Sequence, residues 1–76
     1  MNVLRRRRLE MIGYQLEIAT VQLIDIQEDE IAARDNVPQE MEGSPIYARA
    51  NKYVMDLQQA IESLQAALAA IQEARE

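Results

Sequence analysis

The sequence predicts an all-α protein, an antiparallel two-helix hairpin with coiled-coil-like packing that dimerises into a four-helix bundle. Three observations lead to this prediction. Two long segments repeat apolar residues at helical spacing. A short segment rich in helix breakers separates them. The first segment is also apolar on two opposite faces, and a single domain of 76 residues has too little chain to cover both.

The first helix is expected from about residue 3 to about residue 35. Its first apolar stripe follows alternating steps of three and four residues, the spacing of one helix face. We predict that this stripe forms the hairpin core of the first helix: Leu9, Ile12, Leu16, Ala19, Leu23 and Ile26. Gly13 is the only glycine in this helix. It either allows close approach of the second helix or is simply tolerated, at about 1 kcal/mol relative to alanine.

A second apolar stripe lies on nearly the opposite side of the same helix. We predict that it is the oligomer interface, formed by Met11, Tyr14, Ile18 and Val21. A second hairpin docked there with two-fold symmetry gives a homodimer. The competing arrangement is a higher assembly, which also uses the alanines near the end of the second helix, Ala66, Ala69 and Ala70.

The linker is expected over about residues 36–44. Pro38 disfavours helical backbone at Val37, and Asn36 tolerates a left-handed helix cap. Residues 38–42 can form one helical turn that ends at Gly43. Ser44 followed by Pro45 is a start signal for the next helix, since serine caps the first turn and proline suits its first position.

The second helix is expected over about residues 45–75 and has one clean apolar stripe. After Tyr47 and Ala50, the predicted hairpin core consists of Val54, Leu57, Ile61, Leu64, Leu68 and Ile71. Apolar residues at every seventh position flank and widen this stripe: Ile46, Tyr53, Ala60, Ala67 and Ala74. The short linker forces the two helices to run antiparallel, with a period of 3.5 residues that predicts a left-handed supercoil.

Composition restricts the chemistry of the chain. The absence of Cys and His excludes disulfides, thiolate or imidazole metal sites and a histidine base. The sequence therefore predicts no enzyme activity and no cofactor. No segment reads as a signal peptide or as a span of roughly 20 apolar residues, so a soluble cytoplasmic protein without a membrane partner is expected.

Charge is distributed unevenly. The net charge is −5, but residues 1–8 carry four arginines and no carboxylate. Arg5, Arg6, Arg7 and Arg8 are the possible nucleic-acid contacts, because adjacent arginines can bind several phosphates. The alternatives are pairing with Glu73 and Glu76 at the end of the second helix, a solvated end, and contact with an anionic membrane. The acidic remainder makes nucleic acid an unlikely partner.

Carboxylates gather near the linker: Asp25, Glu28, Asp29, Glu30, Asp35, Glu40 and Glu42. The spacing of Asp25 and Glu28 places them on one helix face, as in all-helical magnesium-dependent nucleotide hydrolases. Those enzymes need a second carboxylate pair on the facing helix, which offers only isolated Asp56 and Glu62. A solvated patch is favoured, and imitation of a phosphate backbone is the alternative. Glu30 either lies in a frayed, solvated part of the stripe or fixes the helix register beside Arg34 or a cation of a partner chain.

Residues 35–44 read D-N-V-P-Q-E-M-E-G-S, and residues 60–67 read A-I-E-S-L-Q-A-A. These segments resemble short acidic helical proteins of Gram-positive bacteria and their phages and plasmids, which have a D-N-x-P turn followed by an A-I-x-S-L-type helix. This chain departs from that pattern at Gln39, and its second helix is less acidic, with Gln58, Gln59, Gln65 and Ala66. The resemblance implies the hairpin fold and an origin on a mobile element, and it transfers no catalytic residue.

Two classes of function follow. The favoured one is a non-enzymatic protein–protein interaction or regulatory module, which associates with itself and with a host or phage protein. The alternative is a small nucleic-acid-binding protein that uses Arg5–Arg8. The sequence does not identify the partner or the biological process.

Overall fold

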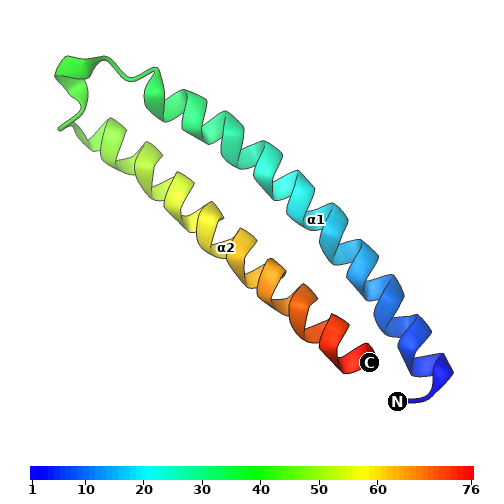
Figure 1. Ribbon diagram of the computed structural model, residues 1–76. Coiled ribbons are helices and arrows are strands. Elements are labelled where there is room, and N and C mark those ends of the chain that lie inside the picture. Colours follow the sequence, from blue (N-terminus) through cyan, green and yellow to red (C-terminus); the bar gives the residue numbers. More distant parts are fainter.

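The computed structural model describes all 76 residues and shows a two-helix hairpin. Helix α1 spans Val3–Asp35, a short 3₁₀ turn η1 spans Gln39–Met41, and helix α2 spans Pro45–Arg75. Figure 1 shows α1 and α2 running in opposite directions, with the linker at one end and both termini at the other. The predicted all-α antiparallel hairpin is confirmed, with both helices ending where their apolar patterns end.

Local capping explains the helix bounds. The Asn2 side chain accepts a hydrogen bond from the Arg5 amide at 2.8 Å, and Ser44 caps α2 through the Tyr47 amide at 3.4 Å. Pro45 occupies the first position of α2, as expected. Asn36 differs from the expectation, because its φ of −83° is right-handed. The turn needs no left-handed residue, since the Asn36 amide already binds the Ala32 carbonyl oxygen at 3.0 Å.

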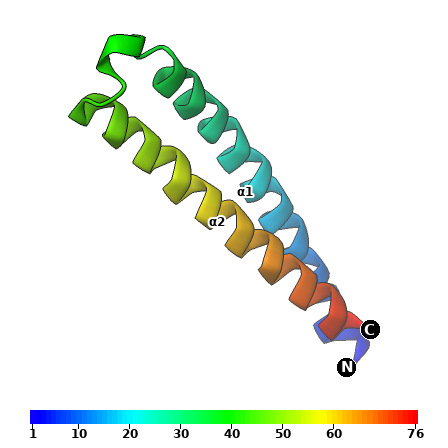
Figure 2. The same cartoon turned by 60° about the vertical axis from the view of Figure 1, so that its left-hand side comes forward.

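The hairpin is long and thin. Its principal extents are 59 × 15 × 12 Å, and its radius of gyration is 17.4 Å, where a compact chain of this length has about 11 Å. The two views in Figures 1 and 2 show that the helices lie side by side along the whole length. Such a shape has one line of contact between helices and no globular core. Only four residues of the chain are buried.

The seam between the helices is anchored by α2. Val54 and Ile61 are its two buried apolar residues, at 8% and 3% exposure. The other predicted core residues of α2 are half-buried: Leu57, Leu64, Leu68 and Ile71. On α1 the least exposed positions step by four and three residues: Leu9, Gly13, Leu16, Thr20, Leu23 and Gln27.

This seam corrects two core predictions on α1. Ile12 and Ile26 are 43% and 50% exposed, because the seam passes through the following residues, Gly13 and Gln27. Position 13 faces α2: a Cβ atom on Gly13 would lie 3.9 Å from Leu68 Cδ2, an ordinary van der Waals distance. Ile12 and Ile26 therefore lie beside the seam, on one side of the hairpin.

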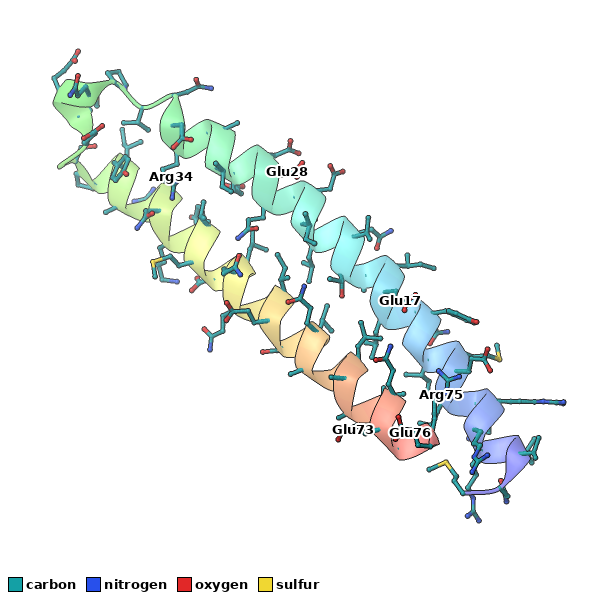
Figure 3. All side chains as sticks on the ribbon, viewed as in Figure 1. Glu17, Glu28, Arg34, Glu73, Arg75 and Glu76 are labelled. Carbon is teal, nitrogen blue, oxygen red and sulfur yellow. The ribbon has the colours of Figure 1, made fainter.

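Side-chain hydrogen bonds join the two helices near the linker. The Gln27 side-chain amide donates to the Val54 carbonyl oxygen at 3.3 Å and to Gln58 Oε1 at 2.9 Å. Arg34 reaches from α1 toward α2, where it donates to Asn51 Oδ1 at 3.0 Å, as Figure 3 shows. Its Nε also lies 3.2 Å from an Asp35 carboxylate oxygen. Arg34 does not pair with Glu30, which is half-exposed.

Candidate interaction surfaces

The outer face of α1 points directly away from α2. It consists of the four residues predicted as an oligomer interface, Met11, Tyr14, Ile18 and Val21, which are 56–67% exposed. No part of the chain covers them. A row of four large apolar side chains on a solvated helix face is unusual, and contiguous patches of this kind mark interaction sites. The tyrosine hydroxyl at the edge of the face donates to Glu10 Oε1 at 2.9 Å.

A second apolar surface, the lateral face, lies on one side of the hairpin and is built from both helices. Its residues recur every seventh position, so they share a face. They are Ile12, Ala19, Ile26 and Ala33 on α1, and Ile46, Tyr53, Ala60, Ala67 and Ala74 on α2. A shallow depression lined by Ile26, Tyr53 and Leu57 shows that both sets lie on the same side. The seven-residue repeat of α2 was visible in the sequence. The matching residues of α1, Ile12, Ala19 and Ile26, were instead predicted to lie in the hairpin core.

The opposite side of the hairpin is more polar, although Ile24 and Ile31 of α1 recur there at seven-residue spacing. A depression along α2 is lined largely by charged and amide side chains, among them Asn51, Lys52, Gln59 and Glu62. At the open end an ion pair joins the two helices on this side, with Arg75 Nη2 at 3.6 Å from Glu10 Oε2 (Figure 3). The two sides thus differ in kind, which gives the hairpin one lateral surface suited to burial and one suited to water.

The arginine cluster at the open end is exposed and forms no ion pair. Arg6 donates to the backbone carbonyl oxygen of Glu76 at 3.2 Å, whereas the side chains of Glu73 and Glu76 pair with none of the four arginines. The expected pairing with these carboxylates is therefore not formed, although both lie at this end (Figure 3). Because successive helical residues point about 100° apart, the four side chains spread around α1 and do not form one basic stripe.

Charge and helix dipole oppose each other along α1. Four arginines occupy the first two turns, where the dipole is positive, and the first turn has no acidic residue. Carboxylates occupy the last turns, where the dipole is negative: Asp25, Glu28, Asp29, Glu30 and Asp35. Both placements are unfavourable, since anions are stabilised at helix N-termini and cations at C-termini. An isolated α1 therefore has a basic first end and a mainly acidic last part, in which Arg34 pairs with Asp35.

Two titratable groups, Tyr14 and Lys52, have shifted pKa values. The Tyr14 hydroxyl donates to the Glu10 carboxylate, and this raises the pKa of Tyr14 above its usual value. The Asp56 carboxylate at 2.6 Å likewise raises the pKa of Lys52. Both shifts move the pKa further from neutrality, the opposite of what general acid–base catalysis requires. Asp25 and Glu28 lie in a depression on α1 whose other residues are Val21, Gln22 and Ile24, and no cluster of three metal-binding side chains occurs.

Comparison with protein-family models, curated proteins and solved structures gives no match for this chain. The resemblance to acidic helical proteins of Gram-positive bacteria therefore stays a prediction. Neither helix has a stretch apolar enough, over the required length, to cross a lipid bilayer.

Proposed function

We propose that this protein is a non-enzymatic interaction module that works through its exposed helix faces, associating with itself and with a protein partner. The structure offers two separate apolar surfaces and few features of an active site. A helical hairpin with two exposed apolar surfaces is incomplete as a free monomer, because those side chains remain in water.

The observation that carries this proposal is the excess of exposed surface. The chain exposes 5821 Å², whereas a compact monomer of 8.7 kDa exposes about 4,700 Å². The difference, about 1,100 Å², is close to the roughly 800 Å² that each partner buries in a standard protein–protein interface. Burial of the exposed apolar faces would supply the stability that a single line of helix contact lacks.

The partner we expect beyond a second copy is a host or phage protein, in keeping with the resemblance to proteins of mobile elements. A regulatory role follows from such binding, in which the module occupies a helical surface of its target. The outer face of α1 is suited to this contact, since an amphipathic helix binds through residues spaced like Met11, Tyr14, Ile18 and Val21.

Light scattering over a concentration series tests the self-association. We expect at least a dimer at micromolar concentration, with circular dichroism showing a mostly helical protein. A monomer up to 100 μM would contradict the proposal. Specific, reversible complexes dissociate in this concentration range, since a dissociation constant of 1 μM corresponds to a binding free energy of about 8 kcal/mol.

A second function, nucleic-acid binding, is favoured by one observation: the four arginines are free of carboxylate partners. Titration with duplex and single-stranded nucleic acid at two salt concentrations separates the two functions. Binding through the arginines predicts salt-sensitive affinity that disappears when Arg5–Arg8 are replaced by glutamine. The interaction module predicts no binding, and we favour it because the chain carries thirteen carboxylates against eight cations.

A further inference from the structure

We infer that a second copy of this chain covers the lateral face in an antiparallel arrangement, with the two linkers at opposite ends of the dimer. This inference rests on the proposed self-association and specifies its surface and its direction. The two surfaces described above are not equivalent as dimer interfaces, and geometry, charge and side-chain size each favour the lateral face.

The geometry of a four-helix bundle requires each helix to contact two neighbours at roughly a right angle. The outer face lies opposite the seam, so docking there would place four helices in a row and enclose no common core. The lateral face lies about one residue, or 100°, around α1 from the seam. A second hairpin placed on it brings α1 and α2 of both copies around one shared interior, the four-helix bundle that the sequence predicted.

Charge selects the antiparallel direction. The open end of the hairpin, residues 1–10 and 69–76, carries five arginines against three carboxylates. The linker half, residues 25–56, carries eight carboxylates against three cations. An antiparallel partner places the basic end of each copy beside the acidic half of the other, which neutralises both ends of α1. A parallel partner would bring like charges together, at a cost in affinity.

Side-chain size agrees with this direction. The lateral residues of α1 are symmetric about Ala19, so a two-fold axis at Ala19 places Ile12 opposite Ile26 of the second copy. Gly13 faces Leu68 and Gln27 faces Val54, so Ala19 lies level with residues near 62 on α2. The same axis therefore sets Tyr53 level with residue 71 of the second copy, between the small lateral residues Ala67 and Ala74.

The axis also pairs two exposed charges that have no partner within the chain. Arg8 lies beside Ile12 at the open end, and Glu30 lies beside Ile26 near the linker. Each is eleven residues from Ala19, so Arg8 of one copy lies level with Glu30 of the other. Within one chain they are about 33 Å apart along α1, too far to interact directly.

This arrangement packs α1 against α1 of the second copy and leaves both outer faces uncovered, side by side on one edge of the dimer. The lateral face would then serve self-association, and the outer face would stay free for the protein partner. The two surfaces can therefore be separated by mutation.

The first experiment compares Ile26→Glu with Ile18→Glu by light scattering. The two residues are similarly exposed on the same helix, at 50% and 60%, so both variants should remain helical by circular dichroism. We expect Ile26→Glu to weaken dimerisation at least about a hundredfold, because two carboxylates enter the apolar interface, and Ile18→Glu to leave the dimer intact. The reverse result would overturn the lateral interface but preserve self-association. A monomeric wild type would overturn both.

The second experiment measures direction. The chain has no cysteine, so Gln39→Cys in the linker gives a single site for a spin label. In the antiparallel dimer the two labels are separated by about the length of the hairpin, 59 Å. In a parallel dimer they lie close together. A short distance in pulsed electron paramagnetic resonance would overturn the inferred direction, whatever the interface.

The third experiment exchanges charge. We expect Arg8→Glu and Glu30→Arg each to weaken the dimer about tenfold, since each pair occurs twice, and the double variant to recover most of the affinity. The matched control combines Arg7→Glu with Glu30→Arg, because Arg7 precedes Met11 by four residues and belongs to the outer face. Recovery in the control, or its absence in the double variant, would contradict the pairing of Arg8 with Glu30.

Discussion

Helices α1 and α2 share one seam but contribute to it in opposite ways. Helix α2 places its large apolar residues in the seam, and its buried positions are Val54 and Ile61. The buried positions of α1 are Gly13 and Thr20, one residue without a side chain and one with a hydroxyl. Three leucines of α1, Leu9, Leu16 and Leu23, are half-buried in the seam, whereas its isoleucines Ile12, Ile18 and Ile26 lie on the outer and lateral faces.

This difference teaches that the two helices have different tasks. Helix α2 supplies the buried apolar side chains of the seam. Helix α1 supplies small or polar buried residues and keeps apolar residues exposed for contact with other chains. Thr20 fits this description, because its hydroxyl donates to the Leu16 carbonyl oxygen of its own helix at 2.7 Å and forms no hydrogen bond across the seam. Stability of the hairpin should accordingly respond to mutations in α2, and association to mutations in α1.

The largest expected effect is at Ile61. Replacement of Ile61 by alanine removes the most buried side chain of the seam and should destabilise the protein by about 2–5 kcal/mol. The matched change Ile18→Ala on α1 should alter hairpin stability by about 0.5 kcal/mol or less, because its site is exposed. Thermal unfolding at one fixed protein concentration compares them. Equal losses of stability in the two variants would contradict the different roles assigned to the two helices.

An increase in stability is expected at Gly13. A Cβ atom there meets only Leu68 Cδ2 at 3.9 Å, an ordinary contact distance, and the backbone has no positive φ. Gly13→Ala should therefore stabilise the protein by up to about 1 kcal/mol through helix propensity. Urea unfolding measures the gain. A loss of stability would show that the helices approach more closely at this point than the structure indicates.

A smaller gain is expected at Thr20. Thr20→Val keeps the side-chain shape, removes a hydroxyl at a site with 7% exposure and leaves no buried group without a partner, since the Leu16 carbonyl oxygen retains its helical hydrogen bond. We expect a stabilisation of roughly 0.5 kcal/mol, read from the same urea titration. Clear destabilisation would mean that the hydroxyl bends or positions α1 in a way required for packing.

The smallest effect concerns pH and the outer face. The hydrogen bond to Glu10 raises the pKa of Tyr14, so the folded state favours the neutral phenol. The stability from this bond is fully present below pH 10, the usual pKa, and is lost as pH rises through the higher folded value. In an ultraviolet titration one of three tyrosines should ionise late, and Glu10→Ala should remove this delay. An unchanged late step in Glu10→Ala would contradict the assigned cause.

The sequence predicted the hairpin because the relevant signals are local. Asn2, Ser44 and Pro45 define helix starts by hydrogen bonds and backbone restrictions within a few residues, and the 3.6-residue period reveals which residues share a face. The sequence also indicated an outer face on α1, since two stripes on one helix cannot both contact a single partner helix. The charge imbalance between the two ends was likewise visible.

Only the tertiary structure decided which residues of α1 line the seam. Periodicity selects the largest apolar residues, Ile12 and Ile26, whereas the approach of α2 selects Gly13 and Thr20, because close contact between two helices depends on backbone distance and side-chain volume in three dimensions. That shift by one residue moves Ile12 and Ile26 to the side of the hairpin, next to Tyr53 of α2. A surface formed by two helices exists only after they pack, so the sequence of either helix alone could not reveal it.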